Sequence, residues 1–534
     1  MVWKSGEKTP MKIWGFYSVF YLIFAVFCLL TIFVGFDYYD SGFILALSSK
    51  LNDGQIIYRD FDYVRPFGTP VFWAILLKPF FFVKDYLYLI CRMLVLMQFA
   101  VISYQVSRVI FNNDRWDKRM LISIPFLMIS NINIFPAMPW HTIDGLFFLS
   151  LSLFYLHKKN ILLAILFSII AATTKQSFFL IPFLLTVISV FFHRRFNFKL
   201  NLKFFLILAS CIIILLIFKI PDALYFYRSV SLDSNKKIIY DVGFEIYLDS
   251  FKYIFPFLGS AIIAILIWIK IKNSSSFVPN FIGIFLGFCF LIPFYHYVTD
   301  YYSATPKYTD YTILSSANAL LPITVFLLIY SIFKDRKKTL NTTLTEVCAA
   351  TIIWSSAISW GAGNIFLAFP FVFLTLKSDS FFSNKIMMIL LPLSILNLRI
   401  INPYLEKNIF EERYIKLENL PVYSGIYTSK SNAEYLAQSK VIFEKYKNIL
   451  FLPGFPAASV MFEKTKNRMP WEMNVEYPNY KKDLSLLHCK NLYFVVDKKS
   501  FSYDKNSFYG SSFTDEVKKK KTKIDSTGLF YIYK

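Results

Sequence analysis

The sequence predicts a multi-pass α-helical membrane protein of about 13 transmembrane helices, followed by a small extracytoplasmic α/β domain. Of its 534 residues, 56% are hydrophobic and only 17% are charged. The apolar residues are grouped in stretches of about 20, which soluble domains do not show. After residue 401 these stretches end and the composition becomes that of a soluble protein. We therefore expect a transmembrane domain over 1–401 and an extracytoplasmic domain over 402–534.

The first apolar stretch follows Lys4, Lys8 and Lys12 and at first resembles a signal peptide. Its apolar core is too long for one, and no small-residue cleavage site follows it, so we interpret it as an uncleaved first transmembrane helix. The predicted transmembrane helices lie near 13–35, 86–111, 120–137, 143–156, 160–174, 177–192, 204–218, 253–269, 277–298, 313–333, 344–360, 364–376 and 381–400.

Basic residues indicate the orientation of the chain. The net charge is +22, which in a soluble protein would favour nucleic acid. Here the basic residues follow the positive-inside rule, so we expect membrane lipids and no nucleic acid as partners. The N-terminus is then cytoplasmic, and an odd number of helices puts the C-terminal domain outside. The basic loops contain Arg115, Lys118 and Arg119; Lys158 and Lys159; Arg194, Arg195 and Lys199; Lys270 and Lys272; and Lys334, Arg336, Lys337 and Lys338.

The segment 67–84 is apolar but short, and it contains Lys78 and two prolines. Counting it as a transmembrane helix would reverse the charge pattern downstream. We therefore place it in the first external loop, 36–85, as an interfacial or re-entrant helix.

The start of this external loop is acidic. Asp37 and Asp40 stand where the chain leaves the first predicted helix. After Asp40, apolar residues at helical spacing predict a short amphipathic helix on the membrane surface, and Asn52-Asp53-Gly54 predicts its end. One interpretation is that Asp40 caps this helix, and a catalytic role for Asp40 is compatible with capping.

Three motifs in the loop resemble a known family. They are Asp40-Ser41-Gly42-Phe43, the segment Gly54 to Phe61 that ends in Tyr58-Arg59-Asp60-Phe61, and Arg65-Pro66-Phe67 before the apolar segment. In this order they resemble the GT-C glycosyltransferases, which include protein O-mannosyltransferases and lipid A aminoarabinose transferases. The sequence departs from the usual pattern at Ser41, where Glu is common, at Arg65, where Lys is usual, and at Phe67, where a second Pro is usual.

The resemblance implies a GT-C-like fold and an integral-membrane enzyme of the cell inner membrane. Such an enzyme transfers a sugar from a polyprenyl-phosphate carrier to an acceptor in the cell envelope, which is a glycan, a lipid or a protein. We expect Asp40 to be the base in an inverting displacement. The resemblance also implies a second acidic residue near Asp144, which follows His141 at the outer start of the fourth predicted helix. The alternative is that Thr142 or Asp144 caps this helix.

Cationic side chains are expected to bind the substrate and stabilise the leaving phosphate. The candidates are Arg65, Arg92 and Lys175, and with them we group Asp37, His141 and His296 as substrate-binding residues. Arg92 lies inside a predicted helix, where a charge marks a function or a partner, unless it reaches the outer interface. Lys175 and His296 have ordinary interfacial alternatives.

No two Cys or His residues stand at zinc spacing and there is no glycine-rich nucleotide loop, so we expect no cofactor, with a divalent cation possible but not indicated. Two rival functions stay open. A transporter or flippase for polyprenyl-linked glycans would show broken helices in paired repeats. An O-antigen ligase or polymerase would carry its large external loop between transmembrane helices.

In the C-terminal domain, strand-like runs at 449–452, 492–496 and 529–533 and a helix-like run at 431–446 predict an α/β fold.

Overall fold

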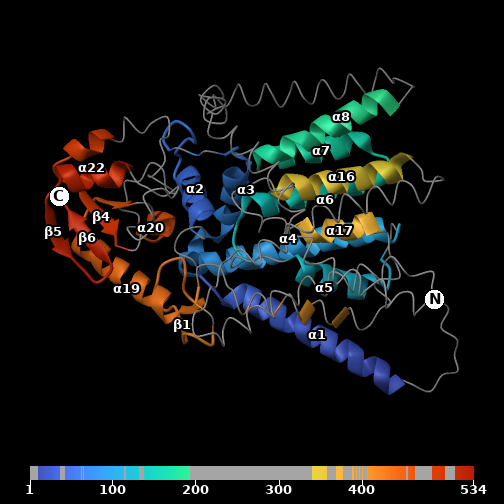
Figure 1. Ribbon diagram of the computed structural model, residues 1–534, viewed down its shortest axis with the longest axis horizontal. Helices are drawn as coiled ribbons and strands as arrows, with labels where there is room; N and C mark the ends of the chain where they lie inside the picture. The colour runs from blue at the N-terminus through green and yellow to red at the C-terminus, as the bar shows by residue number, and fades with distance from the viewer. Residues whose placement is uncertain are drawn as a thin grey trace, which may run out of the picture.

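The computed structural model describes residues 10–36, 42–61, 63, 65–112, 116–131, 137–192, 340–357, 368–376, 388–389, 392–393, 396, 400, 406–407, 409–452, 455–462, 484–498 and 512–534. The predicted helices near 204–218, 253–269, 277–298 and 313–333 lie outside these residues. Figure 1 shows the two parts of the molecule: a group of long helices, and a smaller unit with strands at one end of it.

The helical part contains long helices where the apolar stretches predict them. Its elements are α1 (Pro10–Phe33), α2 (Phe43–Asn52), α3 (Gly68–Leu77), η1 (Lys78–Tyr86), α4 (Leu87–Ile110), α5 (Met120–Ser130), α6 (His141–His157), α7 (Ile161–Ala172), η2 (Gln176–Phe179), α8 (Leu180–Phe192), α16 (Leu340–Ala357) and α17 (Phe369–Leu376). Helix α6 packs against α4, α7 and α16, and α17 packs against both α4 and α16. These elements enclose the candidate site.

Two stretches, Gly15–Phe33 and Gly68–Ile110, are long and apolar enough to cross a bilayer. In the first stretch, only 22% of the most apolar 18-residue segment is buried. Large apolar side chains such as Leu22 and Leu29 are exposed along it. A helix that is apolar and exposed over this length is typical of lipid contact. These two stretches agree with the predicted membrane location, and the total of about 13 transmembrane helices stays a prediction.

The segment 67–84 forms a short helix, as predicted, followed by a 3₁₀ helix. Helix α3 has 10 residues, or roughly 15 Å at 1.5 Å per residue, which is too short to span a bilayer. The 3₁₀ helix η1 contains Val83 in a non-helical conformation (φ −106°, ψ 46°), so the chain bends before α4 begins. This bend separates α3 from the long helix that follows.

Helix α2 also forms where the sequence predicts it, and it ends at Asn52 with Gly54 in the left-handed region (φ 81°). Its expected position on the membrane surface stays a prediction. Helix α2 packs between α3 and α20 (Pro456–Met461) of the C-terminal unit, and Phe43 to Ser48 are all buried. The apolar face that suggested lipid contact is instead covered by protein.

The C-terminal unit has the predicted mixture of strands and helices. Its elements are β1 (Tyr414–Lys416), β2 (Tyr427–Ser429), α19 (Lys430–Lys445), β3 (Ile449–Leu452), α20, η6 (Leu484–His488), β4 (Tyr493–Asp497), α22 (Ser512–Lys520), β5 (Lys523–Ser526) and β6 (Phe530–Tyr533). Four strands form a sheet in the order β3-β4-β6-β5, in which β3 and β4 are parallel and the other pairs antiparallel. Strands β1 and β2 form a separate antiparallel pair near the helical part (Figure 1).

Candidate functional site

The turn before α3 fixes the backbone of Arg65. The amide of Ile56 donates to the Asp60 carboxylate at 2.8 Å, and the amide of Tyr58 donates to the carbonyl of Phe61 at 2.8 Å. This tight turn places Tyr58 at a positive φ of 68°. The buried Tyr58 hydroxyl then donates to the carbonyl oxygen of Arg65 at 2.5 Å. The motif from Gly54 to Phe61 is thus a scaffold for Arg65.

The Arg65 side chain meets His141 inside the protein. Arg65 Nη1 lies 2.6 Å from His141 Nε2, and the two residues are 8% and 0% exposed. An arginine nitrogen only donates, so Nε2 is the acceptor and the proton of the neutral imidazole sits on Nδ1. Among the described residues this Nδ1 has no hydrogen-bond partner. The pair therefore holds an unused, buried N–H donor.

Lys175 joins this pair from the connection between α7 and η2. Its ammonium donates to the carbonyls of Ser356 at 2.9 Å and Ser355 at 3.3 Å, at the C-terminal end of α16. Burial lowers the pKa of Lys175, and the nearby Arg65 lowers it further. Two of the three ammonium protons are used by α16, which leaves one for another acceptor. Arg65, His141 and Lys175 are hereafter called the basic cluster.

Gly68 allows the start of α3 to meet the connection between α7 and η2. The amide of Gly68 donates to the carbonyl of Thr173 at 2.8 Å. A Cβ at Gly68 would lie 2.2 Å from Thr173 Oγ1 and 2.6 Å from its carbonyl oxygen. Only glycine fits at this distance, because real Cβ contacts do not come so close. Gly68 therefore lets the start of α3, which follows Arg65, approach the connection that carries Lys175.

Asp144 lies inside α6, and it does not cap that helix. Helix α6 begins at His141 with Trp140 at the N-cap position, so the capping interpretation of Thr142 and Asp144 is wrong. The Asp144 carboxylate is wholly buried and accepts from Trp73 Nε1 at 3.0 and 3.1 Å and from Gln98 Nε2 at 2.8 Å. It links α3, α4 and α6.

Tyr63 is buried within the electrostatic influence of both Arg65 and Asp144. Burial raises the pKa of the Tyr63 hydroxyl, while the charge of Arg65 lowers it and that of Asp144 raises it. Both charges are thus close enough to act on one buried hydroxyl. No sequence pattern indicated Tyr63, Trp73 or Gln98, because an aromatic or amide side chain in an apolar run has no distinctive spacing.

Several buried polar atoms at this place have no partner among the described residues. Leaving a buried polar atom unpaired costs roughly 1–3 kcal/mol, so native proteins tolerate few and often use them to bind something. Here they belong to residues of the cluster or next to it: Tyr63 Oη, His141 Nδ1, Thr142 Oγ1 and Ser355 Oγ. Most of these can donate a hydrogen bond, and the basic cluster supplies positive charge. The arrangement is suited to bind an anion.

Arg92 has a different position. Its side chain is wholly buried, so the interpretation that it reaches the outer interface is wrong. Its Nη atoms donate to the carbonyls of Ile32 in the last turn of α1 and of Val34 and Gly35 just after it. Its guanidinium lies 4.7 Å from the ring centre of Tyr88. A cation at a helix C-terminus pairs with free carbonyls and with the helix dipole. These contacts identify the backbone of α1 as the partner of Arg92.

The remaining expected site residues, Asp37, Asp40 and His296, lie outside the described residues. The N-cap position of α2 is occupied by Gly42, and both the capping and the catalytic interpretation of Asp40 stay predictions. In the part of the chain that the structure describes, no three His, Cys, Asp or Glu side chains are grouped to hold a metal ion.

Comparisons with known proteins give a distant similarity to solved structures. No family model matches the sequence, and no curated protein matches it. Among solved structures, the chain is similar to the archaeal oligosaccharyltransferase AglB from Archaeoglobus fulgidus, solved in complex with an inhibitory peptide and a dolichol-phosphate. The TM-score is 0.42 and the identity 10%, over 92% of this chain and 70% of that chain. A similarity this distant does not indicate a function, so the function is inferred below from the side chains of the site.

Proposed function

We propose that the protein is an integral-membrane glycosyltransferase that transfers a sugar from a polyprenyl-phosphate carrier to an extracytoplasmic acceptor, with inversion at the anomeric carbon. The observation that carries this proposal is the basic cluster, in which Arg65, His141 and Lys175 are buried together. The three motifs of the first external loop, which resemble those of GT-C enzymes, support it from the sequence.

A phosphate group fits the basic cluster better than a neutral ligand. Burying cationic groups side by side is costly unless an anion accompanies them. Charge-assisted hydrogen bonds to phosphate oxygens would use the His141 Nδ1 proton and the third proton of Lys175, and they are stronger than bonds between neutral groups. The same contacts would stabilise the negative charge that develops on the leaving lipid phosphate.

The chemistry then needs a base for the acceptor. In this proposal Asp40 removes a proton from the acceptor hydroxyl or amine, the acceptor oxygen or nitrogen bonds to the anomeric carbon, and the bond from that carbon to the lipid phosphate breaks. Asp144 acts as a positioning residue, because both its oxygens accept hydrogen bonds inside the helical part. It holds α3 against α6 and so keeps Arg65 beside His141. Arg92 is left out of this mechanism.

The proposal places the enzyme in a cell inner membrane with its N-terminus in the cytoplasm and its C-terminal domain outside. This topology follows from the distribution of basic residues. The donor is a polyprenyl-phosphate-linked sugar, and the acceptor is a glycan, lipid or protein of the cell envelope. The mechanism needs no cofactor.

The test compares envelope glycans and glycolipids by mass spectrometry in a parent strain, a deletion strain, and deletion strains that express variants. Arg65→Gln and Asp40→Asn should leave the sugar absent at normal membrane levels of protein. Arg119→Gln is the matched control, because Arg119 lies before α5, away from the basic cluster, with its side chain 47% exposed. A variant of Asp40 that restores the parent profile would refute the base assignment. A deletion without any change of glycans would favour the flippase alternative.

A further inference from the structure

Tyr63 is a buried residue of the first external loop whose hydroxyl group the mechanism above does not use. The side chain is 2% exposed, and among the described residues its Oη has no hydrogen-bond partner. Tyr58 in the same loop is buried to the same degree, and its hydroxyl donates to the carbonyl of Arg65 at 2.5 Å. Folded proteins usually pair a buried hydroxyl in this way. The Tyr63 hydroxyl is therefore suited to bind a molecule that enters the site.

Neighbouring elements hold the Tyr63 ring in place. The ring packs against that of Phe43, with 5.6 Å between the ring centres and 50° between the planes. Phe43 is the first residue of α2, and it is 1% exposed. Helix α2 is bonded in turn to α3, where the Ser48 hydroxyl donates to the carbonyl of Pro70 at 3.2 Å. Packing thus fixes the hydroxyl, which has no bond of its own to any described residue.

The Tyr63 hydroxyl lies close to the phosphate site of the proposed function. Burial raises its pKa, the charge of Arg65 lowers the pKa, and the charge of Asp144 raises it. Arg65 is bonded to His141 of the basic cluster, and Asp144 is bonded to Trp73 of α3. The hydroxyl is therefore near the basic cluster and near the bond that joins α3 to α6.

The chemistry of this hydroxyl fits a sugar better than a phosphate. A phosphate oxygen only accepts hydrogen bonds, and His141 and Lys175 already supply donors for it. A neutral tyrosine hydroxyl both donates and accepts, as the hydroxyl groups of a sugar do. An anion beside Tyr63 would also face the charge of Asp144, which opposes it. In a polyprenyl-phosphate donor the sugar is bonded directly to the phosphate, so it occupies the space beside the basic cluster.

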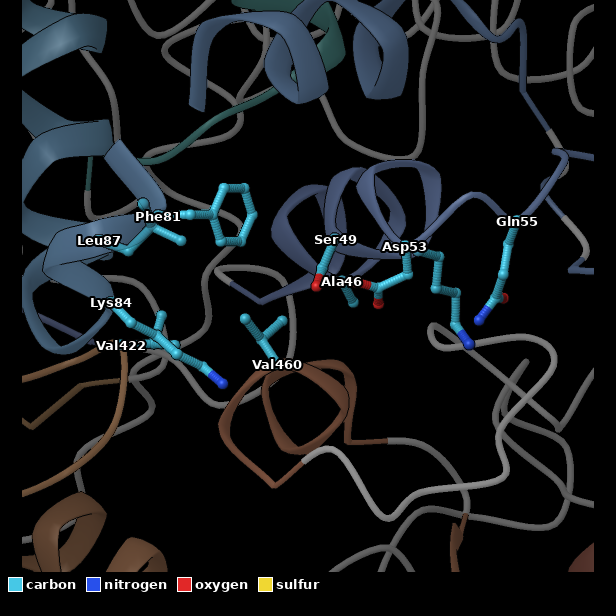
Figure 2. A pocket seen from close by; sticks show the side chains of 10 residues that line it. Ala46, Ser49, Asp53, Gln55, Phe81, Lys84, Leu87, Val422 and Val460 are labelled. Atoms are coloured by element: carbon cyan, nitrogen blue, oxygen red, sulfur yellow. The ribbon is translucent and has the colours of Figure 1, made fainter. Parts of the chain in front are cut away.

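A pocket beside α2 is a rival position for this sugar. Its volume is about 420 Å³, and Figure 2 shows Phe81 and Leu87 on one side of it and Ser49 and Asp53 nearer the other. The lining residues that the structure describes include neither Tyr63 nor a residue of the basic cluster. This pocket therefore offers the donor phosphate none of the three basic side chains, and it enters the test as the alternative.

We propose that Tyr63 binds a hydroxyl group of the sugar that is transferred, while the basic cluster binds the phosphate of the same donor. This assignment rests on the proposed function, because it adds a substrate-binding residue to that site. It also restricts the donor. A deoxy sugar without the bonded hydroxyl would leave the buried Tyr63 hydroxyl unpaired, and sites built to bond a hydroxyl reject such analogues strongly.

Thermal unfolding of the unliganded, full-length protein in lipid nanodiscs is the first measurement. Tyr63→Phe should unfold at the same temperature as the wild type or higher, because it removes a buried polar atom that has no partner. Tyr58→Phe is the matched comparison and should unfold at a lower temperature, because it breaks the bond to Arg65. An equal loss in both variants would show that the Tyr63 hydroxyl is bonded within the protein, which would overturn the proposal.

Sugar transfer and phosphate binding are measured next on the same variants. Tyr63→Phe should lower sugar transfer by purified membranes at least about 5-fold, which is the cost of leaving one buried hydroxyl without its partner. Calorimetric titration with farnesyl phosphate, which carries no sugar, should give the wild-type affinity. Ser49→Ala removes a hydroxyl from the rival pocket and should transfer at the parent rate.

The outcomes separate this inference from the proposed function. Weaker farnesyl phosphate binding by Tyr63→Phe, unchanged transfer by it, or transfer lost only in Ser49→Ala would each overturn the role of Tyr63 in sugar binding. Arg65→Gln should lose both farnesyl phosphate binding and transfer. If Arg65→Gln keeps both, or if deletion changes no glycan, the proposed function fails and this inference fails with it. If Arg65→Gln loses both and Tyr63→Phe behaves like the wild type, only the inference fails.

Discussion

Arg65 and His141 are 76 positions apart in the sequence, yet Arg65 Nη1 lies 2.6 Å from His141 Nε2 in the interior of the protein. The contact joins the turn before α3 to the first residue of α6. It also fixes the imidazole tautomer, since the arginine can only donate. The pair therefore depends on the planar, forked shape of the guanidinium, which lysine does not reproduce.

Arg65→Lys should accordingly lower the rate of sugar transfer by at least about 10-fold, which corresponds to the loss of roughly one charge-assisted hydrogen bond. The lysine keeps the charge but ends in a compact ammonium that cannot bind His141 and a phosphate in the same geometry. The measurement is sugar transfer by purified membranes at equal protein level. Arg119→Lys, at a side chain that is 47% exposed before α5, should transfer at the parent rate. An unchanged rate in Arg65→Lys would show that charge alone suffices.

Trp73→Phe should destabilise the helical part by about 1–3 kcal/mol, because the buried Asp144 carboxylate loses its indole donor and keeps Gln98. The free energy of unfolding can be followed by denaturation in detergent. Trp116→Phe is the matched control, since Trp116 is 58% exposed, and its effect should be within about 0.5 kcal/mol of zero. Equal effects of the two substitutions would mean that the indole donor contributes nothing.

The sequence predicted the helices of this site far better than the contacts between them. Apolar length and periodicity place α2, α4 and α6 because they depend on neighbouring residues alone. Asp144 and Lys175 could be selected because the resemblance to GT-C enzymes implies such residues on the predicted external side. Their partners could not be selected from the sequence. The Trp73 indole lies in an apolar run, and the carbonyls of Ser355 and Ser356 are backbone groups that every residue has.

Arg92 illustrates the same limit. Its presence in an apolar helix correctly indicated that the charge must have a partner. The partner is the free backbone at the end of α1, and a carbonyl group has no signature in a sequence.

Gly68→Ala should destabilise the protein by about 1–3 kcal/mol, because the new methyl group would overlap the carbonyl of Thr173. It should also reduce sugar transfer more than the loss of stability alone explains, since the same contact brings Lys175 toward Arg65. Gly15→Ala is the control: a Cβ there meets nothing within 4 Å, and alanine suits the interior of α1. Thermal unfolding and transfer rate are measured on both variants. If Gly68→Ala behaves like Gly15→Ala, the close approach has no role.

Glu406 should make the attachment of the C-terminal unit depend on pH. Burial raises the pKa of Glu406 above its ordinary 4.5, although hydrogen bonds from Ser429, Thr428 and Phe36 partly oppose this. The folded protein then binds more protons than the unfolded chain between 4.5 and the raised pKa, so the free energy of unfolding should fall as pH rises through that interval. Glu406→Gln cannot titrate and should lack this slope. Its amide nitrogen would also face an amide donor, so the variant should be less stable than the wild type by about 1–3 kcal/mol. Urea denaturation in detergent from pH 4 to 7 measures both effects, and an identical slope in wild type and variant would assign the pH dependence to another group.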